Sequence, residues 1–210
     1  MTEKVIIFDF DGTIADSMAA IVTIANCLAG EFGYKQTSQE QLIQFKSLNS
    51  REVIKQSGVS IFKLPFLIRK VKLELNKQIQ EVSSFPGIKE ALVELKRQGN
   101  RLIIITSNSK ENVIAFLEEH ELQELFDFIY SGTTFGKSKV INKFLRENNI
   151  NPEQAIYVGD ETRDIEAARK SNIRAIAVSW GFNSKELLAA QNPDFLIHQP
   201  NELIDVIGRL

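Results

Sequence analysis

Short apolar runs alternate with segments of helical periodicity along most of the chain. The runs are rich in β-branched residues and are bounded by polar or glycine positions, as is typical of strands. They comprise VIIF (5–8), LIIIT (102–106), FDFIY (126–130), AIYVG (155–159) and RAIAV (174–178). Because the runs are continuous and do not alternate with polar residues, they predict strands that are buried on both faces of a parallel sheet.

The segments between these runs carry apolar residues at the spacing of one helical face. Two such faces are marked by Ile88, Ala91, Leu92 and Leu95, and by Val140, Ile141, Phe144 and Leu145. The alternation of strands and helices predicts an α/β fold, a Rossmann-like doubly wound parallel sheet. After the last run we expect a short helix, a small strand at FLI (195–197) and a terminal helix.

The interval from 9 to 106 is too long for one crossover between parallel strands and indicates an insertion. Its content is helical: 17–31 is rich in apolar residues, Ser38 and Ser50 can each cap a helix, and Pro65 suits a first helical turn. The Phe-Pro-Gly at 85–87 ends the insertion. We therefore expect a core domain over 1–14 and 86–210, and a small helical cap domain over 15–85.

Composition excludes several classes of partner. The 25 basic and 27 acidic residues give a net charge of −2, so no basic surface for nucleic acid or for an anionic membrane is expected. The apolar run at 5–8 is too short for a signal peptide or a membrane span, which predicts a cytoplasmic protein. We expect a monomer or a homodimer. Cys27 is the single cysteine; it excludes an intrachain disulfide and is expected to be buried.

Polar side chains follow the ends of the predicted strands. They are Asp9 and Asp11, then Thr106, Ser107 and Asn108, then Lys137, and finally Asp160 and Asp164. Since the carboxyl ends of parallel strands meet at one edge of the sheet, we expect these residues to converge there. In extended backbone Asp9 and Asp11 would face the same side, and Gly12 would allow a sharp turn; a plain turn after a strand is the structural alternative.

Several carboxylates at one strand edge repel one another unless a cation joins them. A hard divalent cation prefers oxygen ligands, which predicts a Mg²⁺ site. We expect Asp9, Asp11, Asp160 and Asp164 to form its surroundings, with direct ligation by Asp9, Asp160 and a nearby backbone carbonyl. Lys137 would add a second positive charge, although Lys139 is a competing candidate for that role. The structural alternative is that both lysines are simply exposed to solvent at the start of a helix.

The segment after the second predicted run suits phosphate binding. A hydroxyl and backbone N–H groups near the start of a helix, at Thr106 and Asn108, form a phosphate cradle. Helix capping by Ser107 or Ser109 is the structural alternative. In the predicted cap, the loop FKSLNSRE (45–52) offers Lys46, Asn49 and Arg51 to a carboxylate of a substrate, unless it is simply solvated.

Four motifs together resemble the haloacid dehalogenase-like hydrolase superfamily, in its phosphoglycolate-phosphatase-like branch. They are DFDGTIADS (9–17), TSNS (106–109), GKSK (136–139) and VGDETRDIEAA (158–168), in the family's order. The resemblance spans nearly the whole chain. One departure is that many close relatives have Lys-Pro where this chain has Lys137-Ser138.

The resemblance implies a mechanism. Asp9 would be the nucleophile that forms an aspartyl-phosphate, and Asp11 would be the acid and then the base. Thr106 would bind the transferring phosphoryl group and Lys137 would offset its charge. Asp160 would bind Mg²⁺ directly, and Asp164 would position waters or Lys137.

The substrate implied by the resemblance is a small-molecule phosphate ester, with phosphoglycolate as the leading candidate. Gly12, Ser107, Asn108 and Arg51 are the expected substrate-binding residues, and the presence of Asp11 favours ester hydrolysis over displacement of halide. Two alternatives stay open: a sugar-phosphate mutase of the same fold, and a signalling module that holds phosphate on an aspartate without turnover.

Overall fold

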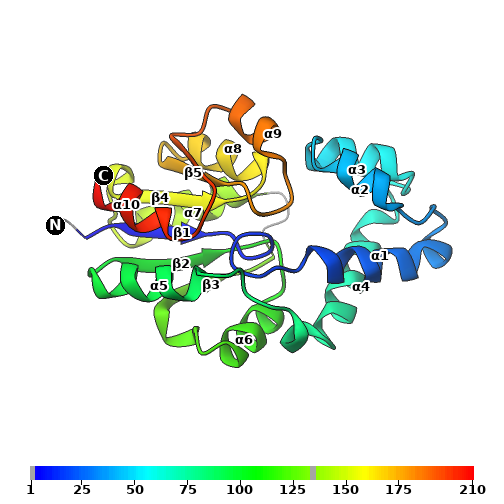
Figure 1. The fold of residues 1–210 in the computed structure, drawn as a ribbon, viewed down its shortest axis with the longest axis horizontal. Coiled ribbons are helices and arrows are strands. Elements are labelled where there is room, and N and C mark those ends of the chain that lie inside the picture. The colour runs from blue at the N-terminus through cyan, green and yellow to red at the C-terminus, as the bar shows by residue number, and fades with distance from the viewer. Residues whose placement is uncertain (1–2, 133–135) are drawn as a thin grey trace.

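A six-stranded parallel sheet forms the centre of the molecule (Figure 1). The computed structural model describes residues 3–132 and 136–210, so residues 1–2 and 133–135 of the expected core domain lie outside the described part of the chain. The strands are β1 (Val5–Phe8), β2 (Arg101–Ile105), β3 (Phe126–Tyr130), β4 (Ala155–Gly159), β5 (Arg174–Val178) and β6 (Phe195–Ile197). Their order is β3-β2-β1-β4-β5-β6, which confirms the doubly wound α/β fold. The order reverses between β1 and β4, the place where such folds bind ligands.

Successive residues of each central strand enter two different cores, because side chains alternate across a strand. Ile6 and Phe8 of β1 pack into one core, and Val5 and Ile7 into the other. Helices α5 (Ile88–Arg97), α6 (Lys110–Glu119) and α10 (Glu202–Gly208) contribute to the first core; α7 (Lys137–Glu147), α8 (Thr162–Lys170) and α9 (Lys185–Ala190) contribute to the second.

Strand β3 departs from the predicted double burial. It lies at the edge of the sheet, and Asp127 and Phe128 in its middle are exposed. The charged pairs of Asp127 with Lys96 (2.6 Å) and Arg101 (3.6 Å) mark this edge, and a charged edge strand discourages pairing with another sheet. Continuity of apolar residues therefore predicted the strand but not its position in the sheet.

Residues 15–85, which we call the cap, contain four α-helices and no named strand, and we call the rest of the described chain the core (Figure 1). The helices are α1 (Met18–Phe32), α2 (Gln39–Phe45), α3 (Ser50–Ser57) and α4 (Leu64–Asn76), followed by the 3₁₀ helix η1 (Ile79–Glu81). The two connections to the core run side by side: Asp16 N–H donates to Ser83 O (2.9 Å), and Phe85 N–H donates to Ile14 O (3.1 Å). These paired connections fix where the helical segment emerges from the sheet.

Side chains cap two of the four helices in this segment, α2 and α3, and two expectations from the sequence need correction. Ser38 caps α2 in a reciprocal capping box, and Pro65 occupies the first turn of α4, as expected. Asn49, however, caps α3 in place of Ser50, whose hydroxyl is engaged elsewhere. Cys27 is exposed and not buried, because it lies on a face of α1 that other helices leave uncovered.

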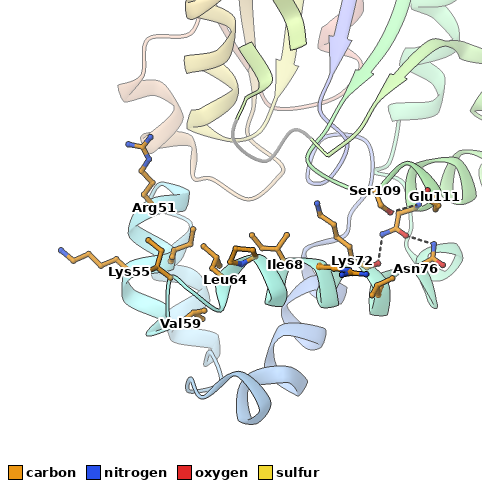
Figure 2. Close-up of a pocket in the computed structure, with 15 residues that line it drawn as sticks. Arg51, Lys55, Val59, Leu64, Ile68, Lys72, Asn76, Ser109 and Glu111 are labelled. Atoms are coloured by element: carbon orange, nitrogen blue, oxygen red, sulfur yellow. Dashed lines mark hydrogen bonds between the residues drawn. The ribbon is translucent and has the colours of Figure 1, made fainter. Parts of the chain in front are cut away.

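A groove of about 1270 Å³ runs between the cap and the start of α6 (Figure 2). Its floor includes Ile54 and Ile68, and basic side chains such as Arg51, Lys55 and Lys72 border it. The C-terminal segment folds as expected into α9, β6 and α10, and short 3₁₀ turns η2 (Gln123–Leu125) and η3 (Pro152–Gln154) precede β3 and β4. None of the helices among the described residues combines the length and apolar character that crossing a bilayer requires.

Candidate active site

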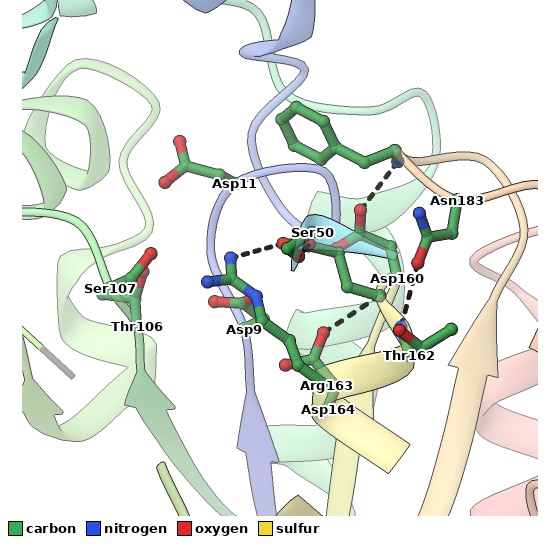
Figure 3. Close-up of polar contacts among 12 residues, drawn as sticks. Asp9, Asp11, Ser50, Thr106, Ser107, Asp160, Thr162, Arg163, Asp164 and Asn183 are labelled. Carbon is green, nitrogen blue, oxygen red and sulfur yellow. Dashed lines mark hydrogen bonds and ion pairs between the residues drawn. The ribbon is translucent and has the colours of Figure 1, made fainter. Parts of the chain in front are cut away.

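Three buried carboxylates meet at the carboxyl edge of the two central strands (Figure 3). Asp9 follows β1 and Asp160 follows β4, and these strands pair in parallel, with Asp9 N–H donating to Val158 O (2.9 Å). Asp164 lies in the first turn of α8. One oxygen atom from each of the three carboxylates lies within 4.8 Å of the others. The convergence expected at a topological switch point thus occurs at β1 and β4.

Asp160 is fixed in place by the loops around it. Thr13 Oγ1 donates to its Oδ1 (2.9 Å), and the Phe182 N–H donates to its Oδ2 (2.7 Å). Gly12, at φ 76°, and Gly181 allow the backbone to come this close: a Cβ at these positions would lie 2.2 Å and 2.3 Å from Asp160 Oδ2. The role of Gly12 in the structure is therefore close packing against Asp160.

Lys137 is the lysine that enters the acidic cluster. Its Nζ lies 2.6 Å from Asp9 Oδ2 and 2.5 Å from Asp164 Oδ1, whereas Lys139 is exposed on α7. Burial alone would lower the pKa of the Lys137 ammonium, but Asp164 and Asp9 raise it well above its usual value. Lys137 consequently remains charged at any physiological pH.

One ammonium does not balance three carboxylates. Burial, reinforced by the charges of Glu161, Asp164 and Asp9, raises the pKa of Asp160 well above its usual value. Burial also raises the pKa of Asp164 to about 6, although Lys137 opposes this shift. Without a further cation, protons must supply the missing positive charge. A donor set made only of carboxylate oxygens suits a hard divalent cation such as Mg²⁺.

Asp11 lies apart from this cluster. Ser17 Oγ donates to its Oδ1 (2.7 Å), and Asn108 Nδ2 donates to both oxygens (3.1 and 2.9 Å). Burial raises the pKa of Asp11 to about 6, with Asp9 adding to the shift while the two hydrogen bonds oppose it. Among the described residues, Asp9, Asp160 and Asp164 form the group whose carboxylate oxygens lie within 4.8 Å of one another, and Asp11 does not belong to it. The chain turns at Gly12, so the same-side geometry of an extended strand does not apply.

The loop after β2 forms a hydrogen-bonded turn. Asn108 N–H donates to Thr106 Oγ1 (3.0 Å), and Ser109 N–H donates to Asn108 Oδ1 (2.8 Å). Ser109 then caps α6 by accepting from the Asn112 N–H. Capping by Ser109 and an ordered loop around Thr106 are therefore both present, and Asn108 serves to hold Asp11.

A smaller cavity of about 360 Å³ lies between cap and core beside Asp11. Ser107 lines it from the core and Lys46 from the cap. Arg51, expected to bind substrate, is exposed and lines the outer groove as well as a surface hollow that includes Lys137. Asn49, offered by the same cap loop, is occupied as a helix cap.

Sequence reasoning missed a set of contacts that join cap and core. Ser50 Oγ of the cap donates to Glu161 Oε2 (2.6 Å), and Glu161 also pairs with the guanidinium of Arg163 (Figure 3). On the other flank, Lys72 of α4 donates to the Ser107 carbonyl. The arginine inside the run GDETRD was an available signal, because it stands between two predicted metal-site acids.

Comparisons with known proteins decide the family. The family model for haloacid dehalogenase-like hydrolases matches residues 6–178, which is most of the chain. The chain belongs to the haloacid dehalogenase-like hydrolase family. It is 36% identical to the phosphoglycolate phosphatase of Synechococcus elongatus over 208 residues, covering 99% of this chain and 98% of that one. The predicted enzyme class, a phosphatase, is thereby confirmed.

Solved structures share the whole fold. A haloacid dehalogenase-like family hydrolase from Streptococcus pneumoniae superimposes with a TM-score of 0.82 at 26% identity, covering 97% of this chain and 98% of that one. A structure from Clostridium acetobutylicum described as a predicted phosphatase gives a TM-score of 0.86 at 25% identity, with both chains fully covered. The similarity therefore includes the cap helices as well as the sheet.

Proposed function

We propose that this phosphatase hydrolyses a small phosphomonoester, phosphoglycolate or a close analogue, through an aspartyl-phosphate on Asp9 and with Mg²⁺ as cofactor. The observation that carries the proposal is the separation of two kinds of carboxylate. Asp9 is ion-paired with a buried lysine inside an acidic cluster, whereas Asp11 is hydrogen-bonded apart from it with its pKa raised to about 6. The ion pair with Lys137 suits Asp9 to act as the nucleophile. The raised pKa of Asp11 gives it a larger protonated fraction near neutral pH than an ordinary aspartate has, which suits a leaving-group acid that later acts as a base.

In the first step an Asp9 carboxylate oxygen attacks phosphorus, and the bond between phosphorus and the ester oxygen breaks. Asp11 gives its proton to the departing alkoxide, which leaves as an alcohol. In the second step Asp11, now a carboxylate, takes a proton from water while the water oxygen attacks phosphorus. The P–O bond to Asp9 breaks, which releases inorganic phosphate and restores the Asp9 carboxylate, with Asp11 protonated again.

The chain's own residues support this sequence. Lys137 offsets charge that develops on the phosphoryl oxygens, since its ammonium lies at the nucleophile. Asp9, Asp160 and Asp164 would hold the cation, which when bound neutralises phosphoryl charge and polarises the P–O bonds. Ser17 and Asn108 hold the Asp11 carboxylate in position for proton transfer.

The proposed substrate rests on similarity and on size. The Synechococcus relative is named for phosphoglycolate, and the cavity beside Asp11, at about 360 Å³, is near the lower end of small-molecule sites. A compact two-carbon acid phosphate therefore suits this cavity better than a large ester does.

The test is a phosphate-release assay on 2-phosphoglycolate and other small phosphomonoesters, with and without Mg²⁺, comparing wild type with Asp9→Asn. We expect Asp9→Asn to lose at least about 10³-fold in kcat, because an amide cannot form the acyl phosphate. Wild-type activity in the variant would refute the assignment of the nucleophile. A mutase would require a bisphosphate activator and release little phosphate, and a phosphoacceptor module would accumulate stable phosphoprotein; either result would replace the phosphatase proposal.

A further inference from the structure

Arg163 lines the same cavity as Asp11. It comes from the first turn of α8, between Asp160 and Asp164, and it lines the 360 Å³ cavity together with Asp11 and Ser107. Cap residues such as Phe45 and Ser50 line the same cavity, so Arg163 lies between core and cap. No step of the proposed hydrolysis uses this arginine.

The guanidinium is anchored to Glu161 through one nitrogen atom. Arg163 Nη2 donates to Glu161 Oε1, and the other oxygen of Glu161 accepts from Ser50 Oγ of the cap (2.6 Å). The Nε of Arg163 is buried and has no hydrogen-bond partner among residues 3–132 and 136–210. An unpartnered buried donor is costly unless a ligand or water satisfies it. Figure 3 shows this guanidinium above Asp9 and near Ser50.

The position of Arg163 indicates which part of a substrate it would meet. Lys137 and the acidic cluster lie on the side of the phosphoryl group, whereas Asp11 marks the side of the leaving group. Arg163 shares a cavity with Asp11, and Lys46 lines the same cavity from the cap. The rest of the lining is largely apolar, apart from the carboxylates of Asp11 and Glu161. Within the described chain Glu161 accepts from Arg163 Nη2 and not from Nε, so the unpartnered Nε of Arg163, together with Lys46, favours an anionic leaving group.

We propose that Arg163 is the binding site for the carboxylate of the substrate's leaving group, and that Glu161 and Ser50 position its guanidinium when the cap is seated. This subsite rests on the proposed function, because it needs a phosphomonoester of a small hydroxy acid. A guanidinium can bind a carboxylate through two parallel N–H donors, which gives both orientation and charge recognition. Specificity would then come from the core of the enzyme as well as from its cap.

The test uses two esters that differ only in this group: 2-phosphoglycolate and ethyl phosphate. For Arg163→Met, kcat/KM for 2-phosphoglycolate should fall roughly 10- to 100-fold, as expected for loss of a charge-assisted hydrogen-bonded pair, while that for ethyl phosphate changes less than about threefold. Arg163→Lys should restore part of the loss. Arg146→Met removes an exposed arginine in the last turn of α7 and should leave both substrates unaffected.

Two outcomes would overturn the proposal: an equal loss with both esters, which would assign Arg163 to the phosphoryl group, or no loss with either. If Arg163→Met does not fold, Ser50→Ala on the cap is the second variant, and it should lower the preference for 2-phosphoglycolate by about 3- to 10-fold. Wild type that turns over neither ester nor any other phosphomonoester refutes the proposed function. Wild type that hydrolyses both esters equally well refutes only the carboxylate subsite.

Discussion

Gly181→Ala is a sharp test of how the acidic cluster is built. The added methyl carbon would lie 2.3 Å from Asp160 Oδ2 and 2.3 Å from Gly12 O, where ordinary van der Waals contact begins near 3.4 Å. Gly181 does not adopt the left-handed backbone that L side chains avoid, so the substitution adds bulk without backbone strain. The Asp160 carboxylate must therefore move by about 1 Å, or the loop that carries Phe182 must withdraw.

Either movement breaks the 2.7 Å hydrogen bond from Phe182 N–H to Asp160. A hydrogen bond to a charged group contributes about 1.5–3 kcal/mol, which corresponds to roughly 10- to 150-fold in an equilibrium constant. Since Asp160 is a proposed metal ligand, the Mg²⁺ concentration for half-maximal phosphate release should rise by roughly 10- to 100-fold. The melting temperature should fall as well, because a buried carboxylate loses one of its two donors.

The assay is a Mg²⁺ titration of phosphate release, with calorimetric titration of Mg²⁺ as a measurement independent of turnover. Gly30→Ala is the matched control, because Gly30 lies in α1 and nothing comes within 4 Å of its added carbon; alanine there should be neutral or stabilising by about 0.5–1 kcal/mol. If Gly181→Ala keeps both the wild-type Mg²⁺ requirement and the wild-type melting temperature, the close approach of Gly181 to Asp160 is wrong.

Three further predictions concern the charged groups. Ser17→Ala removes a hydrogen bond that lowers the pKa of Asp11, so the pKa of Asp11 should rise above about 6. The basic limb of the pH profile of kcat/KM should then move up by about 1 pH unit. A basic limb that stays or moves down would contradict this role, and Ser171→Ala, which removes a buried hydroxyl elsewhere, is the control. Lys137→Met leaves buried carboxylates unpaired and should lower the free energy of unfolding in urea by about 3–5 kcal/mol. Lys139→Met, at an exposed lysine, should change that free energy little. Equal effects of the two substitutions would refute the placement of Lys137. In the presence of a chelator, the pKa values of Asp11 and Asp164, near 6 in the folded state against about 4 in the unfolded state, contribute stability below pH 4 that is lost as the pH rises through 6. The melting temperature of the chelated protein should therefore fall between pH 5 and 7, and Mg²⁺ should raise it more at pH 7. A chelated protein that melts at a higher temperature at pH 7 than at pH 5 would contradict these shifts.

Much of the fold could be predicted from the sequence because hydrophobic patterning reports burial directly. The runs that became β1, β2, β4 and β5 are almost wholly buried, and helices on both faces account for that. The same pattern failed for β3 because edge position depends on strand order, which is a property of the whole sheet. The predicted burial of Cys27 was wrong for a related reason. An apolar helical segment does not indicate which of its faces a neighbouring helix covers.

The site could be predicted as far as strand ends determine it. Asp9 and Asp160 follow adjacent strands, so order along the chain was sufficient to bring them together. Asp11 lies beyond the strand, where the chain turns at Gly12. The rule that alternate residues of a strand face the same side therefore does not place Asp11 beside Asp9. Arg163 and Glu161 depend on docking of the cap, because their partner Ser50 is more than a hundred residues away in the sequence. The sequence marks Arg163 by its place between Asp160 and Asp164, but no local pattern indicates its contact with the cap.

The charge of the cluster explains why a divalent cation fits it better than a monovalent one. Asp9, Asp160 and Asp164 carry three negative charges when ionised, and Lys137 supplies one positive charge, which leaves a deficit of two in a buried region. Arg163 does not reduce that deficit, because Glu161 pairs with it. Protons can fill the deficit only by neutralising carboxylates, as the raised pKa values of Asp160 and Asp164 indicate. A divalent cation restores neutrality with every carboxylate ionised, so binding of Mg²⁺ should release protons and should strengthen as pH rises from 5 to 7.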